Sequence, residues 1–119
     1  MTIRTYAVDR TPPDFHDWIP EISPEERLVV AYYNDIPAGL IRFTARAPEA
    51  EVTFHFVPPE LRGLGIGEQL LEEAIAVAKR ARCSAFYGWV SPGDRVAKLT
   101  YEAQGFRSDK IRVRRDIEL

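Results

Sequence analysis

Three glycines stand at alternate positions, 63, 65 and 67, in the stretch "VPPELRGLGIGEQLL" over residues 57–71. The segment 51–57 before them alternates as a strand does, and apolar residues recur at helical spacing from 66 to 82 after them. The loop therefore joins a strand to a helix N-terminus, where free backbone N–H groups and the helix dipole attract an anion. Glycines lack β-carbons, so an anion can approach the backbone closely.

Two well-known phosphate-binding loops do not fit this stretch. A Walker A loop needs a lysine after its second glycine, and no lysine occurs between residues 57 and 77. A dinucleotide-binding loop needs a third glycine where this chain has Glu68, and its later acidic residue would fall near Cys83. A third interpretation is that the glycines only pack the helix against the strand.

The rest of the chain alternates between strand and helix patterns. The expected strands are 2–8, 27–33, 38–45, 51–57, 84–90 and a final one within 110–119. We expect the strands 27–33 and 38–45 to form a hairpin, and residues Ile111, Val113, Ile117 and Leu119 to share one face of the last strand. The expected helices are 66–82 and a second one from Ser91 to Gln104.

Left-handed Gly105 should end that second helix, with Phe106 folding back on its last turn. Prolines limit residues 10–26 to a short helical turn around 15–19. Together these elements predict one α+β domain over residues 1–119, with a mixed sheet.

Composition narrows the classes of function. The chain has 119 residues, 45% of them hydrophobic, which suits one core, and its net charge of −2 gives no overall attraction to nucleic acid or an anionic membrane. Its longest apolar run, 28–33, is far too short to span a membrane, so a cytoplasmic location is expected. One cysteine and two histidines exclude an internal disulfide and offer no spaced zinc ligands, so no metal is expected.

Two motifs resemble the GNAT superfamily of N-acetyltransferases. Arg62, Gly65 and Gly67 match the pattern (Arg or Gln)-x-x-Gly-x-(Gly or Ala) of its pyrophosphate loop. "AKLTYEAQGF", residues 97–106, is similar to its later helix with Ala, Tyr and Gly-Phe. The order of elements over residues 26–119 also resembles that fold. The resemblance implies a mixed central sheet with two main helices and reduced helical content between the first two strands.

The resemblance also implies a site for acetyl-CoA as co-substrate. The pantetheine arm would run between the strands 51–57 and 84–90, and Tyr101 would donate a proton to the coenzyme A sulfur. The residues expected to hold the cofactor are Phe56, Val57, Arg62, Gly63, Leu64, Gly65, Ile66 and Gly67.

The general base would lie on the fourth strand and face the cleft, often acting through water. Strand alternation places Glu51, Thr53, His55 and Val57 on one face and Val52, Phe54 and Phe56 on the other. Glu51, His55 and a water molecule therefore remain alternative bases. Either side chain could instead have a structural role.

Two departures from the family concern the acceptor and the cofactor. Only about 17 residues, 10–26, separate the first two strands, so part of the usual acceptor pocket is missing. Asp94 stands where the family often has asparagine, and a helix-capping role is favoured for it over a cofactor contact.

Five acidic residues in 14–26 could attract a cationic amine or form a solvated loop. Phe15 and Trp18 could form a cation-binding wall, but covering the core is favoured.

The expected function is acetyl-CoA-dependent transfer of an acetyl group directly to a primary amine of a small molecule or a protein. The alternative is a non-catalytic module that binds an acyl-CoA. Because two covering helices are missing, exposed apolar surface beside the cleft also predicts a homodimer.

Overall fold

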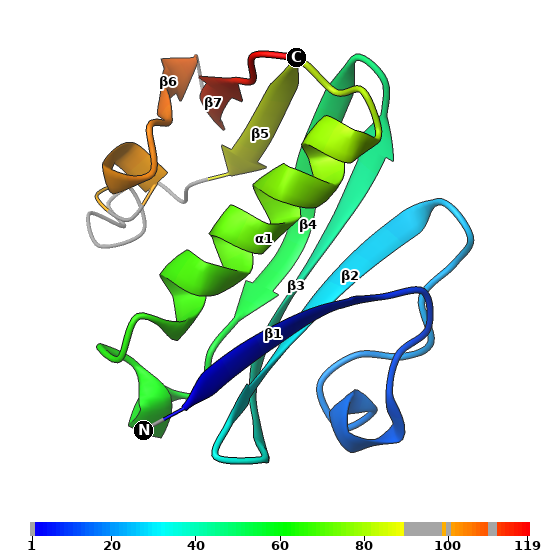
Figure 1. Cartoon of the computed structure of the whole chain (residues 1–119), viewed down its shortest axis with the longest axis vertical. Coiled ribbons are helices and arrows are strands. Elements are labelled where there is room, and N and C mark those ends of the chain that lie inside the picture. The colour runs from blue at the N-terminus through cyan, green and yellow to red at the C-terminus, as the bar shows by residue number, and fades with distance from the viewer. Residues whose placement is uncertain (1, 90–98, 100, 110–111) are drawn as a thin grey trace.

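The computed structural model describes residues 2–89, 99, 101–109 and 112–119 (Figure 1). Its strands are β1 (Ile3–Val8), β2 (Glu26–Tyr33), β3 (Ile36–Arg46), β4 (Glu49–Phe56), β5 (Ala85–Trp89), β6 (Arg107–Asp109) and β7 (Arg112–Asp116). The long helix is α1 (Ile66–Arg80), and two 3-10 turns are η1 (Pro13–Phe15) and η2 (Pro59–Leu61).

All seven strands form one sheet in the order β1-β2-β3-β4-β5-β7-β6. β4 and β5 pair in parallel, and the other described pairs are antiparallel. The predicted single α+β arrangement with a mixed sheet is therefore confirmed. The short strand β6, which pairs with β7, was not among the strands expected from the residue pattern.

The predicted hairpin between β2 and β3 has a tighter turn than expected. Asn34 and Asp35 are its two turn residues, and both have positive φ angles, 48° and 68°. Two-residue turns of this kind follow the twist of antiparallel strands. Ile36 and Pro37 therefore already belong to β3, not to the turn.

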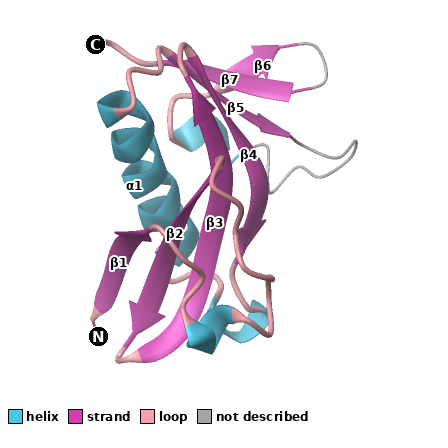
Figure 2. Ribbon diagram, turned by 90° about the vertical axis from the view of Figure 1, so that its right-hand side faces the viewer, coloured by secondary structure: helices cyan, strands magenta, loops and turns pink. Residues whose placement is uncertain are grey.

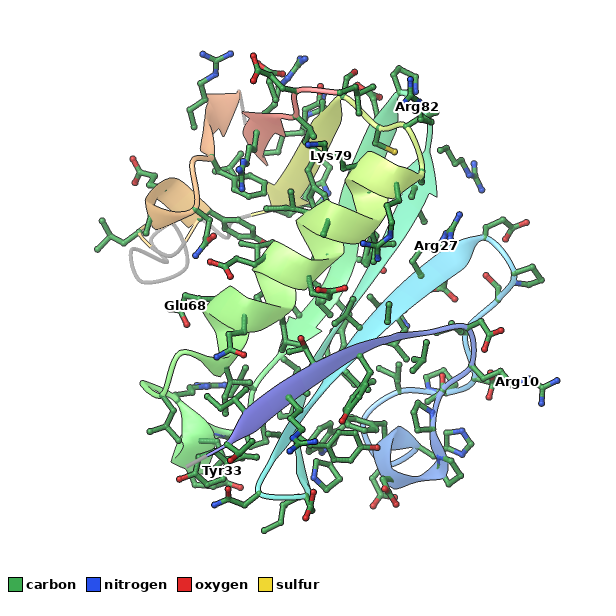
Figure 3. The ribbon with its side chains drawn as sticks, in the orientation of Figure 1. Arg10, Arg27, Tyr33, Glu68, Lys79 and Arg82 are labelled. Carbon is green, nitrogen blue, oxygen red and sulfur yellow. The ribbon has the colours of Figure 1, made fainter. Side chains whose placement is uncertain are left out.

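One face of the sheet is covered by α1 (Figure 2). Leu70, Leu71, Ala74 and Ala78 on the helix are fully buried in a core shared with β2, β3, β4 and β5. The charges along α1 suit its dipole, with Glu68 in the first turn and Lys79 and Arg80 in the last (Figure 3). The helix ends two residues earlier than predicted, at Arg80.

The opposite face is covered by the segment between β1 and β2, which is η1 and irregular chain. Its second core contains Phe15, Ile19, Ile22, Leu28, Val30 and Leu40. Phe15 is fully buried and Trp18 packs against this core, so the interpretation of both aromatics as core cover is confirmed. The expected helical turn around 15–19 is present, since the N–H groups of Trp18 and Ile19 donate to the Phe15 carbonyl at 3.0 and 3.1 Å, and the 3-10 turn Pro13–Phe15 precedes it.

A buried threonine holds this covering segment in place. The Thr11 backbone N–H donates to Glu21 Oε1 at 3.1 Å, its hydroxyl donates to the Pro20 carbonyl at 3.0 Å, and the Ile22 N–H donates to that hydroxyl at 3.1 Å. These bonds fold the chain back on itself without the usual helices. Glu21 is thus engaged in the loop, and Glu26 pairs with Arg42 of β3 at 3.0 Å, so these two acidic side chains already have partners.

A bulge interrupts β4. Arg42 pairs with Phe54 and its neighbour Phe43 pairs with Val52, which leaves Thr53 as an extra residue on β4. Val52 consequently packs in the α1 core while Phe54 packs in the second core, on the other face. The prediction that Val52, Phe54 and Phe56 share one face is therefore wrong, because it assumed unbroken alternation.

The end of the second helix is as predicted. Gly105 has a φ of 85°, and the Phe106 N–H donates to the Tyr101 carbonyl at 3.0 Å. The predicted start at Ser91 and the capping residue Asp94 lie outside the described residues. On the last strand Val113 is buried, but Leu119 is 56% exposed, so the expected common face does not extend to the C-terminus. Ile111 lies outside the described residues.

Candidate active site

The parallel strands β4 and β5 separate after three residue pairs. Glu49, Ala50 and Glu51 pair with Ala85, Phe86 and Tyr87, and the pairing ends there. β4 continues to Phe56 and β5 to Trp89, and the two strand ends point apart in Figure 2. This opening between neighbouring strands, the β4–β5 split, lies where the resemblance placed the pantetheine arm.

Glu51 lies at the point where the strands part. The Trp89 indole Nε1 donates a hydrogen bond of 2.7 Å to Glu51 Oε1, so one side chain from each strand meets across the split. Phe86 and Gly88 of β5 face the α1 core, so Trp89, the residue after Gly88, faces the other side of the sheet. The Glu51 carboxylate is therefore on the face opposite α1.

Tyr101 approaches the split from the α1 side. Its ring lies against Gly88, because a β-carbon at that position would be 2.5 Å from Cε1 and Cζ and 2.8 Å from the hydroxyl oxygen of Tyr101. The side chain is 7% exposed, and burial raises the pKa of Tyr101 to about 12. The phenol therefore keeps its proton at neutral pH and remains able to donate it.

His55 lies on the opposite face from Glu51. A β-carbon on Gly67 would be 3.7 Å from His55 Nε2, so the imidazole faces the first turn of α1. The bulge at Thr53 reverses the direction of the residues after it, which is why Glu51 and His55 do not share a face as predicted. The structure does not bring these two candidate bases together.

The His55 imidazole carries an unusual atom. Its Nε2 is buried and has no hydrogen-bond partner among the described residues. Burial lowers the pKa of His55, and the Gly67 backbone and the Glu68 charge only partly oppose this. A buried polar atom left without a partner costs about 1–3 kcal/mol, so such atoms call for an explanation.

The glycine-rich loop before α1 presents bare backbone. Gly63 and Gly65 have φ angles of 85° and 87°, which favour glycine, and a β-carbon on either would meet nothing within 4 Å. Gly65 caps α1 without any side-chain hydrogen bond, so the first N–H groups of the helix have no side-chain cap. These groups and the helix dipole make the loop suited to an anion.

The remaining predicted cofactor-binding residues surround this loop. Arg62 Nε donates to the Val57 carbonyl at 3.0 Å, which ties the loop to the end of β4. Leu64 is 37% exposed and Ile66 is buried in the α1 core. The ring centroids of Phe56 and Trp18 are 5.2 Å apart on the face opposite α1. Only the backbone of Phe56 could therefore contact a ligand held by the loop.

Two residues of the site were not predicted. Gly88 and Trp89 are the last described residues of an apolar strand. No local pattern indicates that Gly88 accommodates the Tyr101 ring or that Trp89 binds Glu51. Cys83, in contrast, is completely buried and burial raises the pKa of its thiol, which is unfavourable for a nucleophile.

The described part of the chain also lacks two other kinds of feature. No group of three or more His, Cys, Asp or Glu residues there is arranged to hold a metal ion. Within the same residues, no helix has both the length and the apolar character needed to cross a membrane.

Comparisons with known structures place this fold among acetyltransferases. An acetyltransferase from Bacillus subtilis in complex with CoA has a TM-score of 0.81 and 17% identity, over 98% of this chain and 100% of that one. A GNAT family acetyltransferase from Elizabethkingia anophelis with acetyl-CoA bound has a TM-score of 0.77 and 16% identity, over 97% and 98% of the two chains.

PaiA N-acetyltransferase from Thermoplasma acidophilum in complex with coenzyme A has a TM-score of 0.71 and 21% identity. The match covers 78% of this chain and spans only 62% of that longer protein. A comparison with curated protein sequences found no significant match. The profile of the Acetyltransferase (GNAT) family matches residues 3–106, and the chain therefore belongs to that family.

Proposed function

We propose that the chain is an N-acetyltransferase that moves an acetyl group from acetyl-CoA directly to a primary amine. The observation that carries this proposal is the β4–β5 split, with the Glu51 carboxylate on one face and the Tyr101 phenol on the other. Direct transfer needs a base for the amine and an acid for the departing thiolate, on different sides of the thioester.

The glycine-rich loop would hold the diphosphate of acetyl-CoA. Its support is the uncapped first turn of α1 and the left-handed Gly63 and Gly65. With the diphosphate there, the pantetheine arm would enter the split and bring the thioester near Gly88. Binding supplies proximity, which is a large part of the rate enhancement in a two-substrate reaction.

Glu51 is the base in this proposal, acting on the amine directly or through a water molecule. Its Trp89 partner fixes the carboxylate at the opening through Oε1, and the second carboxylate oxygen takes no part in that bond. His55 faces away toward α1, so we do not assign it the base function. Tyr101 is the acid, since its raised pKa of about 12 keeps the phenol protonated.

The acceptor would approach from the face opposite α1. Phe54 and Phe56, whose ring centroids are 6.1 Å apart, and Trp18 form an aromatic surface on that face. Glu51 adds a carboxylate that favours a cationic amine before its deprotonation. A primary amine on a small molecule or at an accessible position of a protein fits this surface.

A thiol-release assay over a panel of amines tests the proposal. Acetyl-CoA and each amine are incubated with the protein, and free coenzyme A is measured with a thiol reagent. Amine-dependent release supports transfer, and mass spectrometry of the acetylated amine identifies the product. Binding of acetyl-CoA without release for any amine would favour the non-catalytic acyl-CoA-binding module instead.

A further inference from the structure

The buried Nε2 of His55 lies under the loop that is suited to bind an anion. His55 faces Gly67 in the first turn of α1, and Nε2 has no partner among the described residues. The first-turn N–H groups of α1 lack a side-chain cap as well. An unpartnered nitrogen and an uncapped helix N-terminus thus meet at one place.

The charged surroundings of His55 are simple. From α1, the Glu68 carboxylate acts on the imidazole, and Figure 3 shows Glu68 at the N-terminal end of that helix. On β3 the residue paired with His55 is Ile41, which is apolar and fully buried. Val57, close to the same Gly67, is also apolar. The electrostatic potential at Nε2 is thus set mainly by the helix end, Glu68 and whatever occupies the loop.

The free protein favours a neutral imidazole. Burial disfavours the imidazolium ion more than the Gly67 backbone and the Glu68 charge favour it, and the positive end of the α1 dipole also disfavours it. A bound diphosphate reverses the sign of the potential at this helix end. The imidazolium form then gains an opposite charge nearby, in addition to the Gly67 backbone and the Glu68 carboxylate that already favour it.

We propose that His55 assists anion binding at the N-terminus of α1 by taking up a proton on its buried Nε2 when a diphosphate occupies the glycine-rich loop. The inference rests on the proposed function, because the diphosphate is that of the co-substrate. It gives His55 a role in cofactor affinity that is separate from the base function of Glu51.

The sign of the pH dependence follows from linkage. If the diphosphate raises the pKa of His55, the bound state carries more protons than the free state between the free and the bound pKa values. Affinity therefore increases as the pH falls through the bound pKa and levels off below the free pKa. Above the bound pKa, both states are neutral and affinity no longer depends on His55.

Dephospho-coenzyme A is the probe that isolates this effect. It carries the diphosphate but lacks the 3′-phosphate, whose own second ionisation falls near pH 6. We expect its Kd, measured by calorimetry, to be about fivefold or more lower at pH 5.5 than at pH 8, within the usual range of coupling between two sites. Titrations in buffers of different ionisation enthalpy should show proton uptake on binding.

His55→Gln is the test variant, since it keeps a polar group near the Nε2 position but cannot ionise. We expect its Kd for dephospho-coenzyme A to be nearly independent of pH. His16→Asn is the matched control, because the half-exposed His16 lies in the segment on the other face, within 3.6 Å of Glu21. This control should retain the pH dependence of the wild-type protein.

Nuclear magnetic resonance of the wild-type protein provides a test that does not depend on folding of a variant. The chain has two histidines, so the His16→Asn spectrum assigns both ring signals. Saturating dephospho-coenzyme A should move the titration midpoint of His55 upward, and the ring signals of the distant His16 serve as an internal reference. An unmoved His55 midpoint, or equal pH profiles of wild type and His55→Gln, would overturn the inference while leaving the proposed function standing. Absence of binding at every pH would overturn both.

Discussion

The Trp89 indole donates a 2.7 Å hydrogen bond to the Glu51 carboxylate at the point where the pairing of β4 with β5 ends. One side chain from each strand thereby replaces the backbone bonds that stop after Glu51 and Tyr87. The bond fixes the orientation of a carboxylate beside an opening, which is what a base needs to act on a substrate held there.

Glu51→Gln should lower kcat/KM by about 10²–10⁴-fold at neutral pH, since an amide cannot accept the proton of the amine. The loss should decrease at higher pH, where more of the amine is already neutral. Trp89→Phe keeps an aromatic ring but removes the N–H donor, and we expect it to lower kcat by a smaller factor with little change in acetyl-CoA affinity. Steady-state kinetics from pH 6.5 to 9.5 make both measurements. A Glu51→Gln protein with wild-type kcat/KM at neutral pH would exclude Glu51 as the base.

Tyr101→Phe should retain folding and acetyl-CoA binding but lose about 10²-fold in kcat at neutral pH, because one hydroxyl is removed and the ring still packs against Gly88 and Phe106. The loss should shrink as the pH rises, since the thiolate then needs a proton less. Ionisation of Tyr101 cannot cause that change below about pH 12, the pKa to which burial raises it. Undiminished turnover at neutral pH would show that the tyrosine only packs.

The same raised pKa predicts how Tyr101 affects alkaline stability. The folded state holds the phenol proton more tightly than the unfolded state, in which tyrosine has its ordinary pKa of 10.0. The contribution of this proton to the free energy of unfolding is fully present below the ordinary pKa and is lost as the pH rises toward about 12. Urea unfolding at pH 8 and pH 11 should show a smaller pH-dependent loss for Tyr101→Phe than for wild type. Equal losses in the two proteins would argue against burial of the phenol.

Gly88→Ala should destabilise the fold by about 1–3 kcal/mol, because the new methyl group would lie 2.5 Å from the Tyr101 ring. Displacement of that ring should also reduce turnover at least as much as Tyr101→Phe does. Gly67→Ala is the matched control for stability, since its methyl group would meet its nearest neighbour at 3.7 Å. Within α1, that change should leave stability unaltered or raise it by up to about 1 kcal/mol. Urea unfolding of both variants tests the contrast, and equal stabilities would contradict it.

Gly65→Val should abolish acetyl-CoA binding, whereas Arg62→Ala should only weaken it. Valine is strongly disfavoured at a φ of 87°, so the backbone N–H groups of the loop would lose their arrangement. Arg62 contributes one exposed hydrogen bond to the Val57 carbonyl. Calorimetry gives the affinities, and thermal unfolding gives a second measure, since a ligand at 100 times its Kd adds about 2.7 kcal/mol of stability. Equal losses in the two variants would contradict the assignment of the loop.

Periodicity was sufficient to predict the long helix, the hairpin and all the described strands except the short β6. Apolar residues on α1 face one core, which the helix shares with the sheet, so their helical spacing is clear in the sequence. The loop glycines were also recognisable, because left-handed backbone at Gly65 leaves few alternatives to glycine.

The bulge in β4 could not be predicted in the same way. Val52, Phe54 and Phe56 alternate regularly, but both faces of β4 are covered by apolar residues, so either face accepts them. The partners of Glu51 and Tyr101 were missed for a related reason. Trp89 and Gly88 acquire their roles from strand pairing and helix packing between distant segments, which no local pattern records.

The extra residue Thr53 divides β4 into two halves, and the alternation of side chains between the two faces shifts by one residue at that point. Deleting this one residue would restore regular alternation while leaving the other side chains of β4 on their present faces, because Val52 and His55 would then be two positions apart. The imidazole of His55 would stay in the layer beneath α1, and the Phe56 ring would stay on the opposite face. Removal of Thr53, a solvent-exposed residue, should therefore change the local bend and twist of β4 more than the composition of either core.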